Sequence, residues 1–115
     1  MTEARALLTL ATKLYPDREW FDDTGMCWQT SAERTGYALS GFDPLNNNDQ
    51  FVAMQIWLHT IGEIEIAKYT ETISRFVLYP YNDSVTSDPV SGFDFDGTEA
   101  GFRVAVLAVA LRLVK

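Results

Sequence analysis

Four aspartates in the C-terminal half are the first residues whose type and spacing could do chemistry. Asp94 and Asp96 flank a phenylalanine, and Asp83 and Asp88 precede them in the same stretch. Carboxylate oxygens are ligands that Ca²⁺ and Mg²⁺ prefer, but a calcium-binding loop also carries a glycine at its sixth position and a glutamate at its twelfth. Counted from Asp94, neither is present. A solvated acidic loop explains these residues better than a metal site, and we expect no metal or other cofactor.

The single histidine and the single cysteine offer little for catalysis. General acid–base work needs a positioned partner, and a nucleophilic thiol needs an adjacent base or electropositive surroundings. His59 lies near the end of an expected helix, and Cys27 follows the acidic pair Asp22 and Asp23. The sequence also contains neither a glycine-rich phosphate loop nor a Gly-x-Ser-x-Gly motif. We therefore expect a protein that is not an enzyme.

Aromatic and acidic residues in polar segments point instead to contact with another protein. Aromatic anchors within a polar rim are typical of protein–protein interfaces, although most large aromatic residues of a small domain belong to its core. The candidate partner-binding residues are Trp20, Phe21, Asp22, Asp23, Tyr81, Asp83, Asp94 and Asp96.

Composition limits the kind of partner. The chain has 115 residues, with 16 acidic and 9 basic side chains and a net charge of −7. That charge disfavours direct binding to nucleic acid and favours a partner with a basic surface, although a charge excess is often only a solvated face. No apolar run approaches the roughly eighteen residues of a membrane span, and no signal peptide is recognisable. We expect one domain, residues 1–115, in the cytoplasm.

Three helices are expected from apolar residues at helical spacing. Asn48 or Asp49 would cap the second helix, Gly62 would end it in the left-handed conformation, and Thr98 would cap the third. The expected helices cover residues 2–15, 50–61 and 99–114.

Strands are expected from alternation and from β-branched residues. Residues 26–30 and 37–42 would pair as a hairpin, and 63–67 and 73–79 would follow the second helix. Residues 17–23 are expected to form a loop, as are 81–97, with a brief extended piece at 93–95. The fold class is therefore α+β, a single-domain sandwich of three helices on a small, mostly antiparallel β-sheet.

One family resemblance rests on two short motifs. Phe42-Asp43-Pro44-Leu45, followed by three asparagines and Asp49, forms an aromatic-Asp-Pro-Leu turn that opens onto a helix, and an alanine-rich helix closes the chain after residues 93–98. This layout resembles the phage α-β-α sandwich family of small bacteriophage and prophage proteins. Valine and leucine dominate the last helix here, whereas many family members have more arginine and alanine. The resemblance implies a phage accessory protein and supplies no catalytic residue.

The leading functional hypothesis combines these features. We expect a non-enzymatic phage accessory protein that binds a host protein with a basic surface and inhibits a bacterial defence system, as an anti-CRISPR protein does. The apolar last helix suggests a homodimer seam.

Two other functions remain open. In a small-molecule module that binds or sequesters a nucleotide, Trp20, Trp28 or Tyr79 would stack on a base, and Arg34 or Arg75 would bind phosphate. A metal-dependent hydrolase at residues 94–96 is the third hypothesis.

Overall fold

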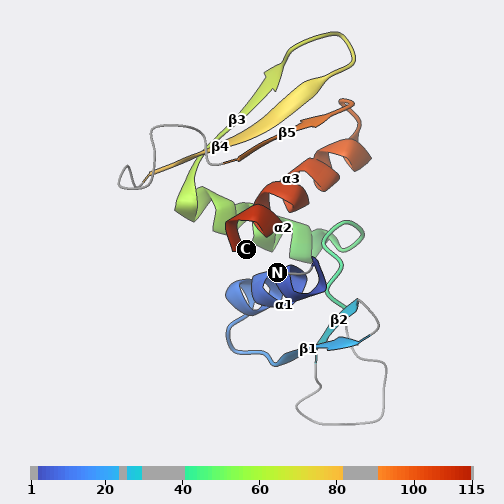
Figure 1. Cartoon of the computed structure of the whole chain (residues 1–115), viewed down its shortest axis with the longest axis vertical. Helices are drawn as coiled ribbons and strands as arrows, with labels where there is room; N and C mark the ends of the chain where they lie inside the picture. The colour runs from blue at the N-terminus through green and yellow to red at the C-terminus, as the bar shows by residue number, and fades with distance from the viewer. Residues whose placement is uncertain (1–2, 24–25, 30–40, 82–90, 115) are drawn as a thin grey trace.

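The computed structural model describes residues 3–23, 26–29, 41–81 and 91–114 (Figure 1). These residues form three helices and five strands, which confirms the α+β class. The elements are α1 (Glu3–Leu14), β1 (Trp20–Asp23), β2 (Met26–Gln29), α2 (Asn48–Ile61), β3 (Gly62–Lys68), β4 (Ser74–Pro80), β5 (Ser91–Phe95) and α3 (Glu99–Val114).

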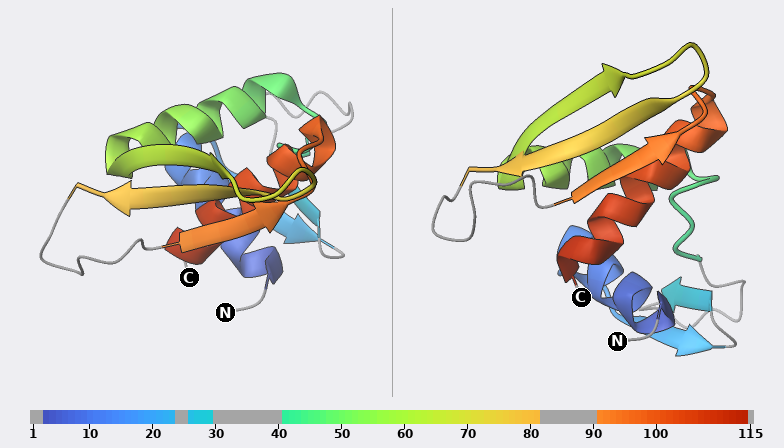
Figure 2. Two further views of the ribbon diagram at one scale, coloured as in Figure 1. Left: turned by 90° about the horizontal axis from the view of Figure 1, so that it is seen from above. Right: turned by 45° about the horizontal axis from the view of Figure 1, so that its top comes forward.

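The elements stack in layers. An antiparallel sheet of order β3-β4-β5 lies at one end of the molecule, and α2 and α3 cover one of its faces (Figures 1 and 2). Helix α1 packs beneath α2 and α3, and the two-stranded sheet β1-β2 lies beyond α1. The described strands therefore form two separate sheets, with all three helices between them.

Helix α2 begins and ends differently from the prediction. Its N-cap is Asn47 rather than Asn48 or Asp49, and the Asn47 side chain accepts a 3.1 Å hydrogen bond from the Gln50 amide. Gly62 does cap the C-terminus, but it is extended, with φ −168°, because β3 starts there. A side chain on Gly62 would overlap the Tyr79 carbonyl oxygen on the neighbouring strand, so close approach of two backbones requires glycine here.

Helix α3 has the cap that the sequence predicted. The Thr98 hydroxyl accepts a 3.0 Å hydrogen bond from the Gly101 amide, and Gly97, with φ 82°, turns the chain from β5 into the helix. The apolar circumference of α3 is used within the chain, because α3 contacts β4 and β5 on one side and α1 and α2 on the other. Of its large apolar side chains, only Val104 is markedly exposed, at 45%.

The first hairpin pairs different residues from those predicted. Residues 20–23, expected in a loop, form β1, which pairs antiparallel with β2 through the register Trp20↔Gln29 to Asp23↔Met26. The charged local composition favours a loop, but Trp20 packs against the core, and this tertiary contact favours the strand. Of the predicted partner strand 37–42, residues 37–40 lie outside the described part, and Phe42 is buried in the core outside any strand.

Strand β5 lies within the segment expected to be mostly loop. Its full length pairs antiparallel with β4, and its two phenylalanines face the helices, as Phe93 opposite Phe76 shows. The Phe102 ring of α3 lies 5.7–6.0 Å from the rings of Phe51, Phe76 and Phe95, measured between centroids. This aromatic cluster joins the sheet to α2 and α3.

Candidate functional site

The face of the three-stranded sheet that points away from the helices is the candidate site. Side chains alternate between the two faces of a strand, so the residues out of phase with the buried Phe76 and Leu78 share the outer face. The pairings Glu63↔Tyr79, Glu65↔Val77 and Arg75↔Asp94 place these side chains next to one another. We call Glu63, Glu65, Arg75, Tyr79 and Asp94 the outer-face set. No helix among the described residues covers this face (Figures 1 and 2).

Arg75 and Asp94 neutralise each other on this face. The Arg75 Nε lies 2.5 Å from Asp94 Oδ1, and its Nη2 lies 3.2 Å from Oδ2, so the contact is bidentate. The hydrogen bonds from Arg75 lower the pKa of Asp94, and the same bonds raise the pKa of Arg75. The guanidinium also stacks on Tyr69, 4.9 Å from the ring centroid. Arg75 is therefore held by groups of its own chain.

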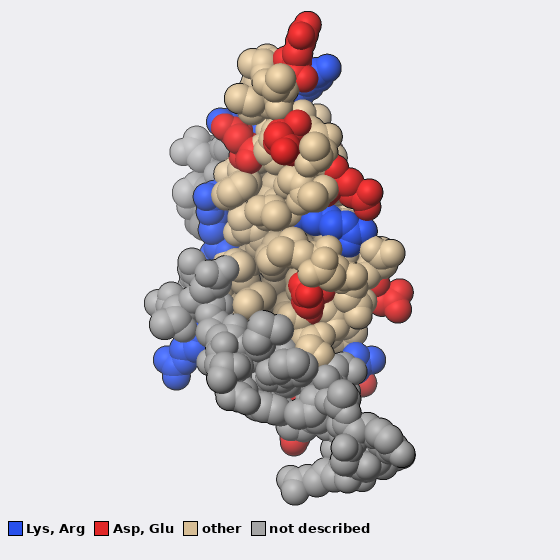
Figure 3. Space-filling view, turned by 90° about the vertical axis from the view of Figure 1, so that its right-hand side faces the viewer, with Lys and Arg blue, Asp and Glu red and all other residues tan. Residues whose placement is uncertain are grey.

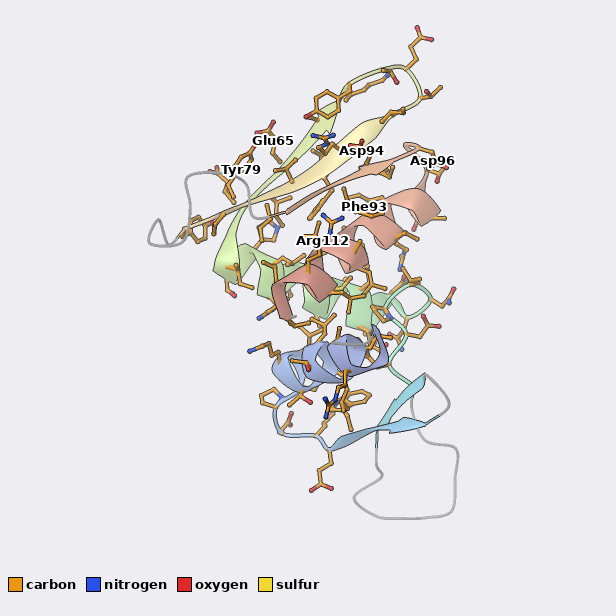
Figure 4. The ribbon with its side chains drawn as sticks, viewed as in Figure 1. Glu65, Tyr79, Phe93, Asp94, Asp96 and Arg112 are labelled. Carbon is orange, nitrogen blue, oxygen red and sulfur yellow. The ribbon has the colours of Figure 1, made fainter. Side chains whose placement is uncertain are left out.

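The outer face also carries two acidic side chains and one aromatic side chain, those of Glu63, Glu65 and Tyr79. All three side chains are exposed, and Figure 4 shows Glu65 and Tyr79 on the same side of the sheet, away from Phe93 and Arg112. Val77, which lies opposite Glu65 on β4, is only 5% exposed. Because Arg75 and Asp94 cancel, the net charge of the outer-face set is that of the two glutamates.

Tyr81 extends the aromatic character beyond the end of β4. Its side chain is 64% exposed, as the sequence predicted. Its backbone amide donates a 3.0 Å hydrogen bond to the Ile61 carbonyl, which fixes Tyr81 beside the start of β3. An exposed ring on a fixed backbone can contact a partner with little loss of main-chain freedom.

Asp96, by contrast, serves the fold. Its Oδ1 accepts hydrogen bonds from the Thr98 hydroxyl at 2.6 Å and the Thr98 amide at 3.0 Å, and these bonds lower the pKa of Asp96. The carboxylate therefore braces the turn into α3. Figure 4 places Asp96 at the end of β5, away from Glu65 and Tyr79.

Trp20 is not the exposed anchor that the sequence suggested. The side chain is half-buried, with its ring 5.9 Å from Tyr15 and 5.7 Å from Phe42 between centroids. Its buried indole N–H has no hydrogen-bond partner among the described groups. Trp20 thus attaches β1 to α1 and to the core.

The other predicted partner-binding residues are only partly placed. Phe21, Asp22 and Asp23 lie in β1, opposite Trp28, Cys27 and Met26, but their side chains are not described. Asp83 lies outside the described residues. The three-stranded sheet therefore brings Asp94 and Tyr81 to one end of the molecule, whereas β1 lies at the other (Figure 1).

The described acidic side chains do not form one continuous patch on the face that Figure 3 shows. Aspartate and glutamate side chains appear there in separate groups, with lysine and arginine between them. A shallow depression of about 420 Å³ is lined by Thr72, Ile73, Asp94, Phe95 and Asp96. The Asp96 carboxylate in its wall is negative and Arg75 is already paired with Asp94, so the depression is a poor receptor for a phosphate group.

The described residues lack two further features, a metal-binding cluster and a membrane-spanning helix. These residues contain no group of three or more His, Cys, Asp or Glu side chains placed to hold a metal ion. Their helices also include none that is both long and apolar enough to span a bilayer.

Glu63 and Glu65 were not predicted as site residues, and Tyr79 was named only as a ring that could stack on a nucleotide base. The sequence Glu63-Ile64-Glu65-Ile66 does alternate, but alternation indicates only which side of a strand is polar. The signal that the outer face is uncovered is the order of the sheet and the positions of the helices. Neither is readable from spacing.

The chain was compared with protein-family models, curated proteins and solved structures. No protein-family model, no curated protein and no solved structure matches it.

Proposed function

We propose that this protein acts by binding another protein through the outer face of its three-stranded sheet. The observation that carries the proposal is that this face holds two exposed glutamates and an exposed tyrosine, with no described helix over it. Tyrosine and ordered polar side chains on a rigid sheet are typical of a binding surface.

The proposed partner has a basic surface at the contact. Arg75 is engaged by Asp94, so it does not offset the charge of Glu63 and Glu65. The whole chain carries a net charge of −7, which would steer a cationic partner toward it. Lysine or arginine side chains of the partner would pair with the glutamates and stack on Tyr79.

The finer proposal is a phage accessory protein that inhibits a bacterial defence system, with a nucleic-acid-binding defence protein as the partner. It rests on the resemblance of the Phe42-Asp43-Pro44-Leu45 turn and the last helix to the phage α-β-α sandwich family. An acidic protein that occupies a basic nucleic-acid site would block it.

Charge reversal at the glutamates tests the binding proposal. We expect Glu63→Lys/Glu65→Lys to lower capture of the partner from bacterial lysate at least about tenfold at low salt. The control, Asp17→Lys/Asp49→Lys, makes the same change in net charge at exposed positions after α1 and at the start of α2, and it should capture the partner with a smaller loss. Capture would be quantified by mass spectrometry after low-salt and high-salt washes.

Equal losses in both double variants would show that only net charge matters and would contradict an outer-face site. Capture of a nucleotide without any protein would instead favour the small-molecule module. That module has weaker support, because the Arg75 guanidinium already binds Asp94 and Tyr69.

A further inference from the structure

Strand β3 presents an open hydrogen-bonding edge. Among the described residues, strand β3 pairs with β4 alone and is the outermost strand on its side of the sheet (Figure 1). In an antiparallel pair, directly opposite residues alternate between those that bond to each other and those whose amide and carbonyl groups point away. The phase of this alternation shows which groups of β3 are open.

Two backbone bonds fix the phase. The Tyr81 amide donates to the Ile61 carbonyl, and the Tyr69 amide donates to the Ile73 carbonyl, each at 3.0 Å between directly opposite residues. Counting inward by twos, Glu63, Glu65 and Ala67 bond to β4. Ile64 and Ile66 therefore point their amide and carbonyl groups outward, and no described residue hydrogen-bonds to them there.

The opposite edge of the sheet is partly blocked. By the same alternation, Gly92 of β5 points its carbonyl outward, and the Arg112 side chain of α3 donates a 2.9 Å hydrogen bond to that oxygen. The Arg112 guanidinium also lies over the Phe93 ring, 5.5 Å from its centroid. Proteins commonly block edge strands in this way, since open edges recruit other chains. Here the block covers β5 and not β3.

The side chains of β3 define what the open edge would accept. Glu63 and Glu65 lie on the outer face, whereas Ile64 and Ile66 lie on the face of the helices, where Ile66 is still 55% exposed. A strand added beside β3 would place its own alternate side chains next to these two rows. Basic residues would match the glutamates, and apolar residues would cover Ile66.

We infer that β3 binds an extended segment of the partner protein by strand addition, with lysine or arginine alternating with apolar residues in that segment. The inference rests on the proposed function, because it specifies how the basic partner is held. The segment's main-chain groups bond to Ile64 and Ile66, and alternate side chains give specificity.

A second copy of this chain carries the same negative charge and fits the edge poorly when the pairing is centred on Glu65. Antiparallel self-pairing centred on Glu65 would set that glutamate directly against its copy on the same face. Like charges directly opposite are destabilising, and each copy carries a net charge of −7. Charge complementarity therefore selects a basic segment.

A synthetic peptide of about eight residues with alternating lysine and valine tests the inference with the full-length protein. Amide hydrogen exchange, followed by NMR, should slow at least about tenfold at Ile64 and Ile66 when the peptide is present. The Glu63 and Glu65 amides, already bonded to β4, should change much less. A peptide N-methylated at every residue, which cannot donate along either edge, and a glutamate–valine peptide should leave exchange unchanged.

Substitution of Ile66 gives a second, independent test of strand addition. Ile66→Pro removes an outward amide that makes no bond to β4, so it should abolish peptide binding and keep the far-UV spectrum. Ile66→Thr keeps the amide and should retain binding, weakened a few-fold. If Ile66→Pro does not fold, the N-methylated peptide makes the same test.

Three outcomes would overturn the inference. They are unchanged exchange at Ile64 and Ile66 at saturating peptide, equal binding of the N-methylated peptide, and protection that rises with protein concentration alone, which would indicate self-pairing. Lysate capture that needs Glu63 and Glu65 but survives Ile66→Pro would keep the proposed function and reject strand addition. Peptide protection without any lysate partner would keep strand addition and reject the proposed function.

Discussion

At the scale of single residues, three exposed carboxylates of the three-stranded sheet and its following turn have different roles. Asp94 is held by Arg75, Asp96 braces the turn before α3, and Glu65 is exposed on the outer face without an ion pair among the described residues. Only a carboxylate that is not neutralised within the chain can contribute net charge to a contact. The glutamates of β3 are therefore more suitable for partner binding than Asp94 and Asp96, the two suggested aspartates whose side chains the structure describes.

The Arg75–Asp94 pair makes stability depend on pH in a defined direction. Hydrogen bonds from Arg75 hold the pKa of Asp94 below its ordinary value of 3.8 in the folded state. Such a group stabilises the fold above its ordinary pKa, and that contribution is lost as the pH falls through the folded pKa. We expect Asp94→Asn to reduce the loss of unfolding free energy between about pH 5 and about pH 2, measured in urea.

Arg75→Gln should have the same effect on the acid dependence, because it removes the donor that lowers the pKa of Asp94. The double variant should show no further change. If the two single effects add, Asp94 and Arg75 act separately and the explanation is wrong.

At the scale of elements, β3, β4 and β5 form a sheet in which two glycines differ in how well they would tolerate an added side chain. Gly62 starts β3 against the Tyr79 carbonyl, a rigid backbone group, whereas a methyl group on Gly92 would meet the Arg75 side chain at 3.3 Å. A flexible side chain can move aside, but a paired backbone cannot. The start of β3 is therefore more constrained than the middle of β5.

Alanine at each glycine measures that difference. We expect Gly62→Ala to lower the free energy of unfolding by about 1–3 kcal/mol, because the overlap must be relieved by moving β3 or β4. Gly92→Ala should change it by about 1 kcal/mol or less, since lost entropy in the unfolded chain offsets the small shift. Chemical denaturation checks both, and equal effects would contradict the close approach at Gly62.

At the scale of the whole molecule, α3 links the layers. Its Phe102 contacts aromatic rings from α2, β4 and β5, and the helix also packs on α1, which carries the β1-β2 sheet. Helix α3 thus supports the three-stranded sheet from the face opposite the outer face. A rigid face suits binding, because little ordering is needed when a partner arrives.

Phe102→Ala should destabilise the whole chain by about 3 kcal/mol, since the cluster loses its shared ring. Val104→Ala on the same helix, at a side chain 45% exposed, should cost about 0.5 kcal/mol or less. Far-UV and near-UV circular dichroism should report one coincident transition in both variants. Separate transitions would show that the layers unfold independently.

Much of the fold could be predicted because its signals are local. Helical spacing located α1, α2 and α3, and alternation located β3 and β4, since these periods reflect the geometry of a single element. Thr98 was identified as a cap because its hydroxyl satisfies an amide three residues away. The exposure of Tyr81 was predicted from its polar surroundings.

The other features depend on contacts between distant segments. Strand β1 has the local composition of a loop, but it pairs with β2, and its first residue, Trp20, packs against the core. Segment β5 is a strand because it pairs with β4. The outer face exists because α2 and α3 cover the other face of the sheet, and the open edge of β3 exists because β4 is its one partner among the described strands. A sequence specifies which residues alternate, but burial and free hydrogen-bonding groups are decided by what packs alongside, and this requires the tertiary structure.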